Sequence, residues 1–469
     1  MAPRPTGPTP APDEAPSRAA ASNGASSRAS AAPPRPAFDH TSTHTEDLMA
    51  FLTASPTPYH AVAEAGRRLT EAGFVRVDAR DAWQDGPGGR YLVRGGTLIA
   101  WYVPGGAPAH APYRIVGAHT DSPNLRVKPR PDTGAAGWRQ IAVEIYGGVP
   151  LNTWLDRDLG LAGRLTLRDG TPRLVRIDQP LLRVPQLAIH LDRDTNEGLR
   201  LDRQHHIRPL WGLGPATDGD LRRKVAAAAG LDAADVAAWD LMLHDLQPPA
   251  LLGDGEQFLV GSRLDNLVST HAGLTALLHA AADRSATDRS APQPVQVLAA
   301  FDHEETGSTS ATGASSPLLE SVLRRAVRTR GGSDEDWERA RAGAYCVSAD
   351  MSHAVHPNYP ERHDPDHLPL PNGGPAVKLN VNQRYATDSE SHTVFTTACE
   401  RAGVPWQSFV TNNSSSCGTS IGPLVAAQLG ITTVDVGVPG LSMHSARELC
   451  GADDPHHLAA ALAAFLTTH

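Results

Sequence analysis

The sequence predicts an α/β fold in which an open, mostly parallel sheet carries helices on both faces and a second, β-rich domain is inserted. Short apolar runs alternate with amphipathic stretches from Leu264 onward, as expected for strands followed by helices on both faces of a sheet. Between about Ser122 and Pro248 the chain instead has strand and turn patterns with few helical signals. With 469 residues, 40% of them hydrophobic, the chain is long enough for more than one domain.

The first folded part is expected at residues 41–121. Residues 44–55 and 59–74 have apolar side chains at helical spacing, and the apolar runs 97–103 and 113–119 predict strands. Residues 1–40 are rich in Ala, Pro and Ser, so they cannot bury enough surface to offset their ordering entropy. We expect this segment to be a disordered tail.

The inserted domain is expected at residues 122–248. Its strand and turn material lies at 141–148, 164–177 and 187–193, and residues 219–243 are expected to be helical. The α/β domain then resumes at 249–469, and residues 283–294 are expected to form an exposed loop. Its predicted elements alternate as strand 257–261, helix 264–282, strand 295–301, helix 317–330, strand 344–350, helix 392–403, strand 407–410, helix 422–430, strand 432–437 and helix 456–466.

Composition excludes several function classes. A net charge of −9 gives no basic footprint for nucleic acid. No apolar run is long enough for a membrane span, and no secretory signal is recognisable. The 4 cysteines form no C-x-x-C pair, which fits a reducing compartment, so we expect a cytoplasmic protein. The 21 histidines are unusually many and point to metal or acid–base chemistry.

Chemically competent side chains follow the predicted strands, and ligands of open α/β sheets bind at the carboxyl ends of strands. The candidates are His119, Asp121, Asp265, Asp302, His303, Glu304, Glu305, Asp350, His353 and His444. Any one alone has a plain structural reading, such as a helix N-terminal carboxylate for Asp265. Two adjacent glutamates at the end of an apolar strand, however, are costly to ionise together without a cation.

The ligand types favour zinc, manganese or cobalt, because histidine and carboxylates occur without sulfur. Five residues satisfy a two-metal centre: one ion is expected on His119, Asp265 and Asp350, and the other on Asp265, Glu305 and His444. Glu304 is left over and is the expected general base. Asp121, two residues from His119, is expected to orient its imidazole.

Seven motifs in order resemble the aspartyl aminopeptidase family of cytosolic dinuclear metallopeptidases. They are GAHTDSPNLRVKP, WLDRDLGLAGR, SRLDNL, FDHEETGS, SADMSHAVHPNY, VKLNVNQRYATDSES and SMHSARE. The resemblance covers the chain from about Thr41 to the C-terminus. It implies a zinc-peptidase-like catalytic domain interrupted by a dimerisation domain, removal of N-terminal Asp or Glu from peptides, two divalent ions per subunit with zinc first, and a tetrahedral homododecamer.

The resemblance also implies substrate contacts. His353 and Lys378 match family positions that contact substrate, as do the site residues Asp350 and Glu304. His190 matches a histidine that reaches from the inserted domain into a neighbouring subunit's active site. Two departures from the family pattern, Thr306 and Gly261, touch no expected ligand.

Three rival readings stay open at this point. The run GTSIG at 418–422 formally fits a nucleophile elbow with Ser420 as nucleophile, but a polar loop precedes it where the elbow needs a strand. A dinuclear carboxypeptidase or deacylase would use the same ligands on a different bond. A non-catalytic self-assembling relative is the third alternative, and the intact ligand set and both glutamates argue against it.

Overall fold

The structure is a computed structural model that describes residues 41–84, 86–282 and 293–468. The expected tail at 1–40 lies outside the described residues, as does most of the expected loop at 283–294. Within the described ranges, no helix has both the length and the apolar character needed to cross a bilayer.

The largest sheet has nine strands, and most of its neighbouring pairs are parallel, which confirms the predicted fold class. In spatial order they are β1 (Val75–Arg76), β2 (Gly88–Arg94), β3 (Thr97–Val103), β13 (Val295–Phe301), β4 (Tyr113–His119), β14 (Tyr345–Ala349), β18 (Thr432–Gly437), β16 (Ala376–Leu379) and β17 (Gln407–Val410). The central strand β4 is buried along its whole length, as expected for a strand covered on both faces.

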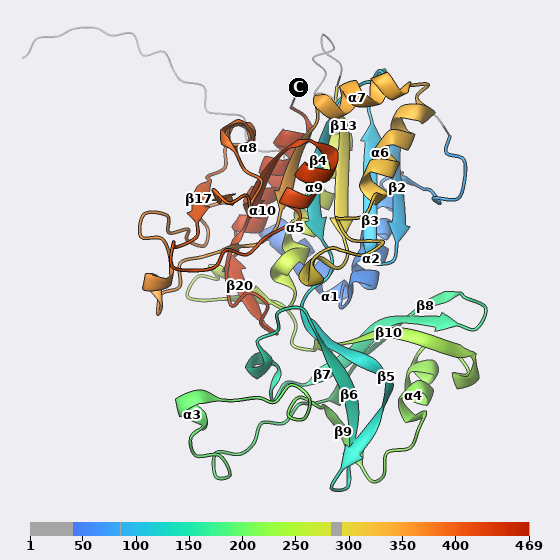
Figure 1. Cartoon of the computed structure of the whole chain (residues 1–469), viewed down its shortest axis with the longest axis vertical. Coiled ribbons are helices and arrows are strands. Elements are labelled where there is room, and N and C mark those ends of the chain that lie inside the picture. The colour runs from blue at the N-terminus through green and yellow to red at the C-terminus, as the bar shows by residue number, and fades with distance from the viewer. Residues whose placement is uncertain (1–40, 85, 283–292, 469) are drawn as a thin grey trace, which may run out of the picture. The chain divides into compact units, whose positions relative to one another are not determined.

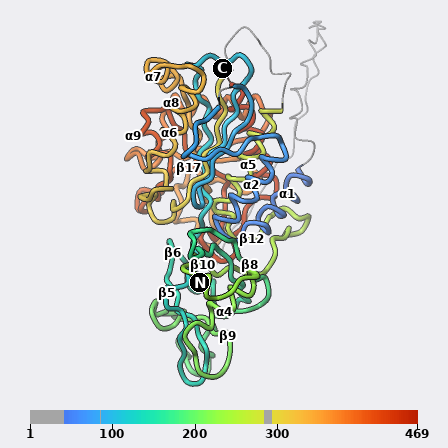
Figure 2. Tube along the Cα trace, turned by 90° about the vertical axis from the view of Figure 1, so that its right-hand side faces the viewer, coloured from blue at the N-terminus to red at the C-terminus, as the bar shows by residue number. Residues whose placement is uncertain are grey.

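Helices cover both faces of this sheet, as Figures 1 and 2 show. Side chains alternate between the faces: Val116 of β4 belongs to one hydrophobic core and its neighbour Ile115 to the other. One face is covered by α1 (Thr41–Ala54), α2 (Pro58–Glu71), α5 (Leu264–Ala282), α8 (Ser389–Ala402) and α10 (Asp454–Leu466). The other face is covered by α6 (Leu318–Thr329), α7 (Asp334–Ala342) and α9 (Gly422–Leu429).

The segment between β4 and β11 builds a separate six-stranded sheet with its own hydrophobic core (Figure 1). In spatial order its strands are β8 (Pro172–Leu182), β7 (Leu159–Leu167), β10 (Val236–Asp245), β5 (Asn124–Ala135), β6 (Trp138–Tyr146) and β9 (Leu210–Leu213). Its helices are α3 (Thr195–Gly198) and α4 (Asp220–Ala228). We call this segment the insert; its exact boundaries and its role in dimerisation stay predictions.

The expectation of a helix over 219–243 is only half right. Helix α4 ends at Ala228, and residues 236–245 form the strand β10, which pairs along its length with β7. The alanines there favour a helix locally, but pairing with β7 and β5 at the centre of the sheet overrides that preference. Residues 187–193, expected to be strand and turn, contain turns and no strand.

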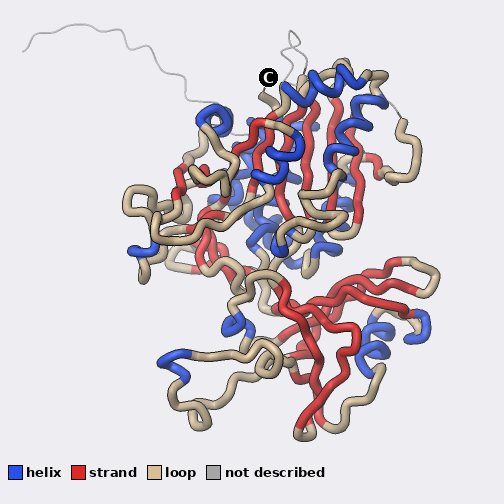
Figure 3. The backbone as a smooth tube through the Cα atoms, in the orientation of Figure 1, coloured by secondary structure: helices blue, strands red, loops and turns tan. Residues whose placement is uncertain are grey.

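A third, small sheet of five strands joins segments that are far apart in sequence. Figure 3 shows in red the strands of the large sheet above and those of the insert below. Its strands, in order, are β11 (Ala250–Leu252), β12 (Phe258–Gly261), β20 (Glu448–Gly451), β19 (Pro439–Leu441) and β15 (Ser352–His353). The strand before Asp265 and the strand before His444 therefore belong to this sheet. The expectation that all candidate ligands follow strands of one sheet was wrong, because two of them follow strands of the small sheet.

Candidate metal centre

The large sheet contributes four acidic or histidine residues at the carboxyl ends of three neighbouring strands. His119 is the last residue of β4, Glu304 and Glu305 lie in the turn after β13, and Asp350 follows β14. These three strands are adjacent and parallel, with Phe301 of β13 paired with His119. Adjacent parallel strands end at the same edge, so the sheet order alone brings these side chains together.

The first ligand group consists of His119, Asp265 and Asp350. The Nε2 atom of His119 lies 3.2 Å from Asp265 Oδ1 and 3.3 Å from Asp350 Oδ1. All three residues are buried, and potential ligand atoms of the three lie within 4.8 Å of one another. Asp265 reaches this position because the first residues of α5 have non-helical backbone angles.

The second ligand group consists of Asp265, Glu305 and His444. The Nε2 atom of His444 lies 3.5 Å from Asp265 Oδ2 and 3.3 Å from Glu305 Oε2. The two oxygens of Asp265 therefore face two different histidines. This is the arrangement expected of a carboxylate shared between two ions, and both groups are those predicted from the sequence.

Both imidazoles are oriented in the same way. His119 Nδ1 lies 3.0 Å from the main-chain oxygen of Asp121, and His444 Nδ1 lies 3.2 Å from that of Gly148. A carbonyl oxygen only accepts, so each Nδ1 carries the proton and donates it. Each Nε2 then points toward carboxylate oxygens, which is the usual orientation of a metal-ligating histidine.

The donor set fits a divalent metal ion. Asp265 Oδ1 and Glu305 Oε1 are buried and accept no hydrogen bond, a costly condition for a carboxylate without a cation. Burial opposes a charge on His444, but Asp265 outweighs that effect and raises the pKa of His444 to about 9. The imidazole of His444 therefore favours binding a cation, either a proton or a metal ion.

Asp121 links the two glutamates to His119. Its Oδ1 accepts a hydrogen bond from Glu304 N and its Oδ2 accepts one from Glu305 N, both at 3.1 Å. Oδ1 also lies 3.5 Å from Nδ1 of His119. The orienting role expected for Asp121 thus extends to the main chain of the Glu304–Glu305 turn.

Glu304 belongs to neither of the groups that contain Asp265, but a third group of potential ligand atoms joins it with His119 and Glu305. Burial and the negative charges of Asp350 and Asp265 raise the pKa of Glu304 to about 8. A carboxyl group with a pKa near neutrality can accept and return a proton during a reaction. At neutral pH such a group is mostly protonated, so the general-base role expected of Glu304 requires nearby positive charge, such as that of bound metal ions, to favour its carboxylate.

Lys378 lies at the site, but its charge is already engaged. The side chain is 2% exposed, and its Nζ donates to the main-chain oxygens of Asp350 and Met351 at 2.9 and 3.2 Å. It also lies 3.4 Å from Asp350 Oδ2. In this structure Lys378 holds a metal-ligand candidate in place.

The two remaining expected substrate contacts are exposed. His353 lies on β15 with its ring 5.7 Å from that of Phe409. His190 lies in an exposed turn of the insert, and within the described part of the chain no hydrogen bond or ion pair joins it to the ligand groups. A role for His190 in its own subunit's site is therefore unsupported.

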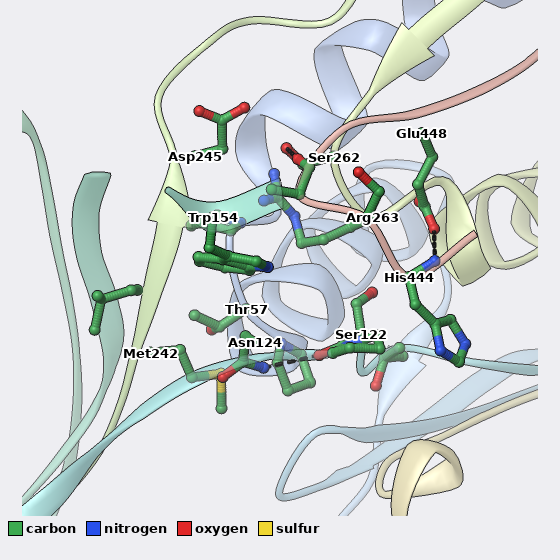
Figure 4. A pocket seen from close by; sticks show the side chains of 17 residues that line it. Thr57, Ser122, Asn124, Trp154, Met242, Asp245, Ser262, Arg263, His444 and Glu448 are labelled. Carbon is green, nitrogen blue, oxygen red and sulfur yellow. Dashed lines mark hydrogen bonds between the residues drawn. The ribbon is translucent and has the colours of Figure 1, made fainter. Parts of the chain in front are cut away.

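Two residues that the sequence did not single out, Glu448 and Tyr146, form hydrogen bonds to residues of the candidate site. Glu448 is buried and accepts hydrogen bonds from Asp265 N at 3.0 Å and from His444 N at 2.7 Å. Figure 4 shows the second of these bonds beside a narrow cavity that Trp154 and Arg263 also line. Tyr146 of the insert donates its hydroxyl to Asp121 Oδ2 at 2.6 Å. Glu448 lies in the SMHSARE motif, whereas no local sequence pattern indicates the hydrogen bond between Tyr146 and Asp121.

The rival nucleophile Ser420 is not placed for attack. It is buried and donates its hydroxyl to Asp435 Oδ1. The residues before it form turns and loop, without the strand that a nucleophile elbow needs. The serine-hydrolase reading therefore has no structural support.

Comparisons with known proteins agree with one another. The family model described as aminopeptidase I zinc metalloprotease (M18) matches residues 51–466. A probable M18 family aminopeptidase 2 of Streptomyces coelicolor is 63% identical over 426 residues, which cover 90% of this chain and 97% of the relative. A chain in the cryo-EM structure of the Ape4 and Nbr1 complex is 35% identical with a TM-score of 0.87, covering 92% of this chain and 87% of that chain. The structure of the S. cerevisiae mApe1 dodecamer is 29% identical with a TM-score of 0.78, covering 90% of this chain and 95% of that chain.

Proposed function

Because the chain belongs to the M18 family of zinc aminopeptidases, we propose that it removes N-terminal Asp or Glu from peptides with two divalent ions and a glutamate base. Family membership makes it a zinc-dependent hydrolase and confirms the resemblance stated from its motifs. The observation that carries the two-ion part is the pair of ligand groups that share Asp265. Zinc is the first candidate for both ions, with manganese and cobalt as alternatives.

His119, Asp265 and Asp350 would hold one ion, and Asp265, Glu305 and His444 the other. Such ions supply Lewis-acid chemistry, polarising the scissile carbonyl and making water more acidic. Glu304 accepts the proton of the attacking water on its carboxylate and returns it to the departing amine. Asp121 keeps Glu304 and Glu305 in place through their main-chain N–H groups.

The preference for acidic residues requires a local positive group, because the net charge of −9 repels acidic peptides. His353 and Lys378 stay the proposed substrate contacts, alongside Asp350 and Glu304. To bind a substrate carboxylate, the ammonium of Lys378 would have to give up its contact with Asp350 Oδ2. The exposed ring of His353 needs no such exchange.

Self-association is part of the proposal. The S. cerevisiae relative is a dodecamer, and a tetrahedral homododecamer would let His190 reach a neighbouring subunit's site. The residues around His190 support a contact there, because Leu187, Ile189 and Leu191 are 55, 46 and 75% exposed. Apolar side chains gathered on a surface commonly mark an interface. A cytoplasmic location also belongs to the proposal, supported by the four free cysteines.

The test is a hydrolysis panel with metal-stripped protein reloaded with zinc, manganese or cobalt. Asp- and Glu-peptides should be cleaved faster than a Leu-peptide, and an N-acetyl-Asp peptide should not be cleaved, because an aminopeptidase needs a free α-amino group. Faster cleavage of the Leu-peptide would overturn the substrate class. Cleavage of the acetylated peptide would favour the deacylase or carboxypeptidase alternative, and no hydrolysis with any metal would favour the non-catalytic alternative.

A further inference from the structure

The end of strand β6 in the insert runs directly past both ligand groups. Tyr146 is the last residue of β6, and Gly147 and Gly148 follow it. We propose that this segment, residues 146–148, positions the metal ligands, with the Tyr146 hydroxyl as its main contact and Gly148 as its second. The inference rests on the proposed two-metal function and adds positioning residues to it.

Tyr146 acts on the first group through Asp121. The Tyr146 hydroxyl donates a 2.6 Å hydrogen bond to Oδ2 of Asp121, because an ionised carboxylate can only accept. Oδ2 also accepts from Glu305 N, so loss of the hydroxyl leaves this buried oxygen with one hydrogen bond. Because the other face of Asp121 meets His119, the hydroxyl helps to set the direction of that imidazole.

The Tyr146 ring is itself held in place from the insert. The guanidinium of Arg126 lies over the ring at 3.6 Å. Arg126 belongs to β5, the strand that pairs with β6. The ring of Tyr146 is therefore fixed by stacking against Arg126 and by the pairing of its strand. This restricts the position of the hydroxyl that contacts Asp121.

Gly148 acts on the second group. Its main-chain oxygen accepts the proton of His444 Nδ1, which leaves Nε2 free to face Asp265 and Glu305. A Cβ at Gly148 would lie 3.2 Å from that same Nδ1. Gly147 is equally close to Glu305, because a Cβ there would lie 3.2 Å from its Cβ. A side chain at either position would therefore require Glu305 or His444 to shift.

The consequence concerns how the centre is assembled. The expected metal ligands all come from elements outside the insert, whereas the groups at 146–148 that orient them belong to the insert's sheet. One three-residue segment touches Asp121, Glu305 and His444. The insert therefore sets the geometry of the metal centre within its own chain.

The test replaces Tyr146 by Phe in the full-length protein, which keeps the ring and its Arg126 stacking and removes only the donor. Tyr345→Phe is a matched control, because Tyr345 also donates to a carboxylate, Glu390, and also has an arginine over its ring. Metal-stripped proteins are titrated with Zn²⁺, and the Co²⁺ forms are compared by visible absorption. We expect Tyr146→Phe to lose about 10- to 100-fold in metal affinity or in kcat and to change the Co²⁺ spectrum. Tyr345→Phe should match the wild type in all three.

A second variant keeps the test decisive if Tyr146→Phe fails to fold. Gly148→Ala should shift His444 and alter Zn²⁺ affinity and the Co²⁺ spectrum, whereas Gly105→Ala, which has open space around its Cβ position, should alter neither. Wild-type metal affinity and spectra in Tyr146→Phe and Gly148→Ala, or equal losses in the controls, would overturn the inference. A wild type that binds Co²⁺ but cleaves no peptide would refute the proposed function, and the spectra would still decide the positioning role.

Discussion

At the scale of single residues, Asp265 is the residue that the two candidate ligand groups share. Its Oδ1 faces His119 and its Oδ2 faces His444, and Glu448 accepts a hydrogen bond from its main-chain N–H. Each histidine is tied by Nδ1 to a carbonyl oxygen, so the lone pair of Nε2 points toward the shared carboxylate. One residue thereby connects two ligand groups that come from separate parts of the chain.

Glu304 is the residue whose role can be separated from metal binding. Replacing Glu304 by Gln keeps the shape of the side chain but removes its ability to take a proton. We expect kcat to fall by at least about 100-fold, the low end of what general acid–base catalysis contributes. Zn²⁺ content measured by elemental analysis should stay at the wild-type level.

Glu320→Gln is the matched control for this change, because Glu320 lies on α6 and outside the ligand groups. It should retain wild-type turnover. Unchanged hydrolysis in Glu304→Gln would show that Glu304 is not the general base. Loss of zinc in that variant would show instead that Glu304 is a metal ligand.

The sequence indicated the candidate ligands that the structure brings together, but not Tyr146 and Gly148, which contact Asp121 and His444. His119, Asp350 and the glutamates stand at predicted strand ends, so their meeting followed from the sheet rule alone. Tyr146 and Gly148 approach the site from the insert, and no spacing within the chain encodes that contact. Lys378 was expected to face substrate, and only its distances to Asp350 show that it is buried against a ligand.

At the scale of elements, the junction of α2 with the insert holds two histidines, the half-buried His60 and the buried His244. His60 of α2 lies 2.8 Å from the Thr57 hydroxyl through Nδ1, and His244 of β10 packs on Gly160 of β7. Burial lowers the pKa of His60 to about 4 and that of His244 to about 3. The nearby charges on both rings come from Arg176, Asp178 and Arg263, and the two arginines lower both pKa values further while Asp178 opposes them.

This junction predicts a loss of stability in acid. Between pH 6.5 and 3 the unfolded chain binds a proton at His244 that the folded chain does not, so the free energy of unfolding falls as pH falls. Each pH unit in this window costs about 1.4 kcal/mol for one such group. His244→Gln should flatten the dependence by about that amount in urea unfolding measured from pH 6.5 to 4.5.

The exposed His205 offers a control, since His205→Gln changes a histidine of the insert away from the junction. It should leave the slope of stability against pH as in the wild type. If His244→Gln were as acid-sensitive as the wild type, the junction would not be the acid-labile element.

Strand β10 shows where reasoning from local pattern stops. Its alanines and the helix before it favour continued helix, yet the segment lies between β7 and β5 and pairs along its length with β7. Likewise the small sheet, whose strands β12 and β19 precede Asp265 and His444, joins β12 with β20, nearly two hundred residues apart in the chain. Such long-range pairing is decided by tertiary contacts, which no local period reveals.

At the scale of the whole molecule, the α/β fold and the order of most of its main elements could be predicted from strand–helix alternation. The chain's membership of the M18 family agrees with the resemblance that its motifs carry. The contribution of the insert could not be predicted: the candidate ligands lie outside it, and it adds Tyr146 and Gly148, which contact Asp121 and His444. That arrangement depends on how the two sheets meet.

The central claim is that one chain holds two divalent ions through a shared Asp265. The most direct test is a titration of metal-stripped protein with Zn²⁺ that is monitored by isothermal calorimetry and by the recovery of hydrolysis. We expect saturation at two ions per chain, with full activity only after the second ion has bound. Saturation at one ion per chain with full activity would contradict it.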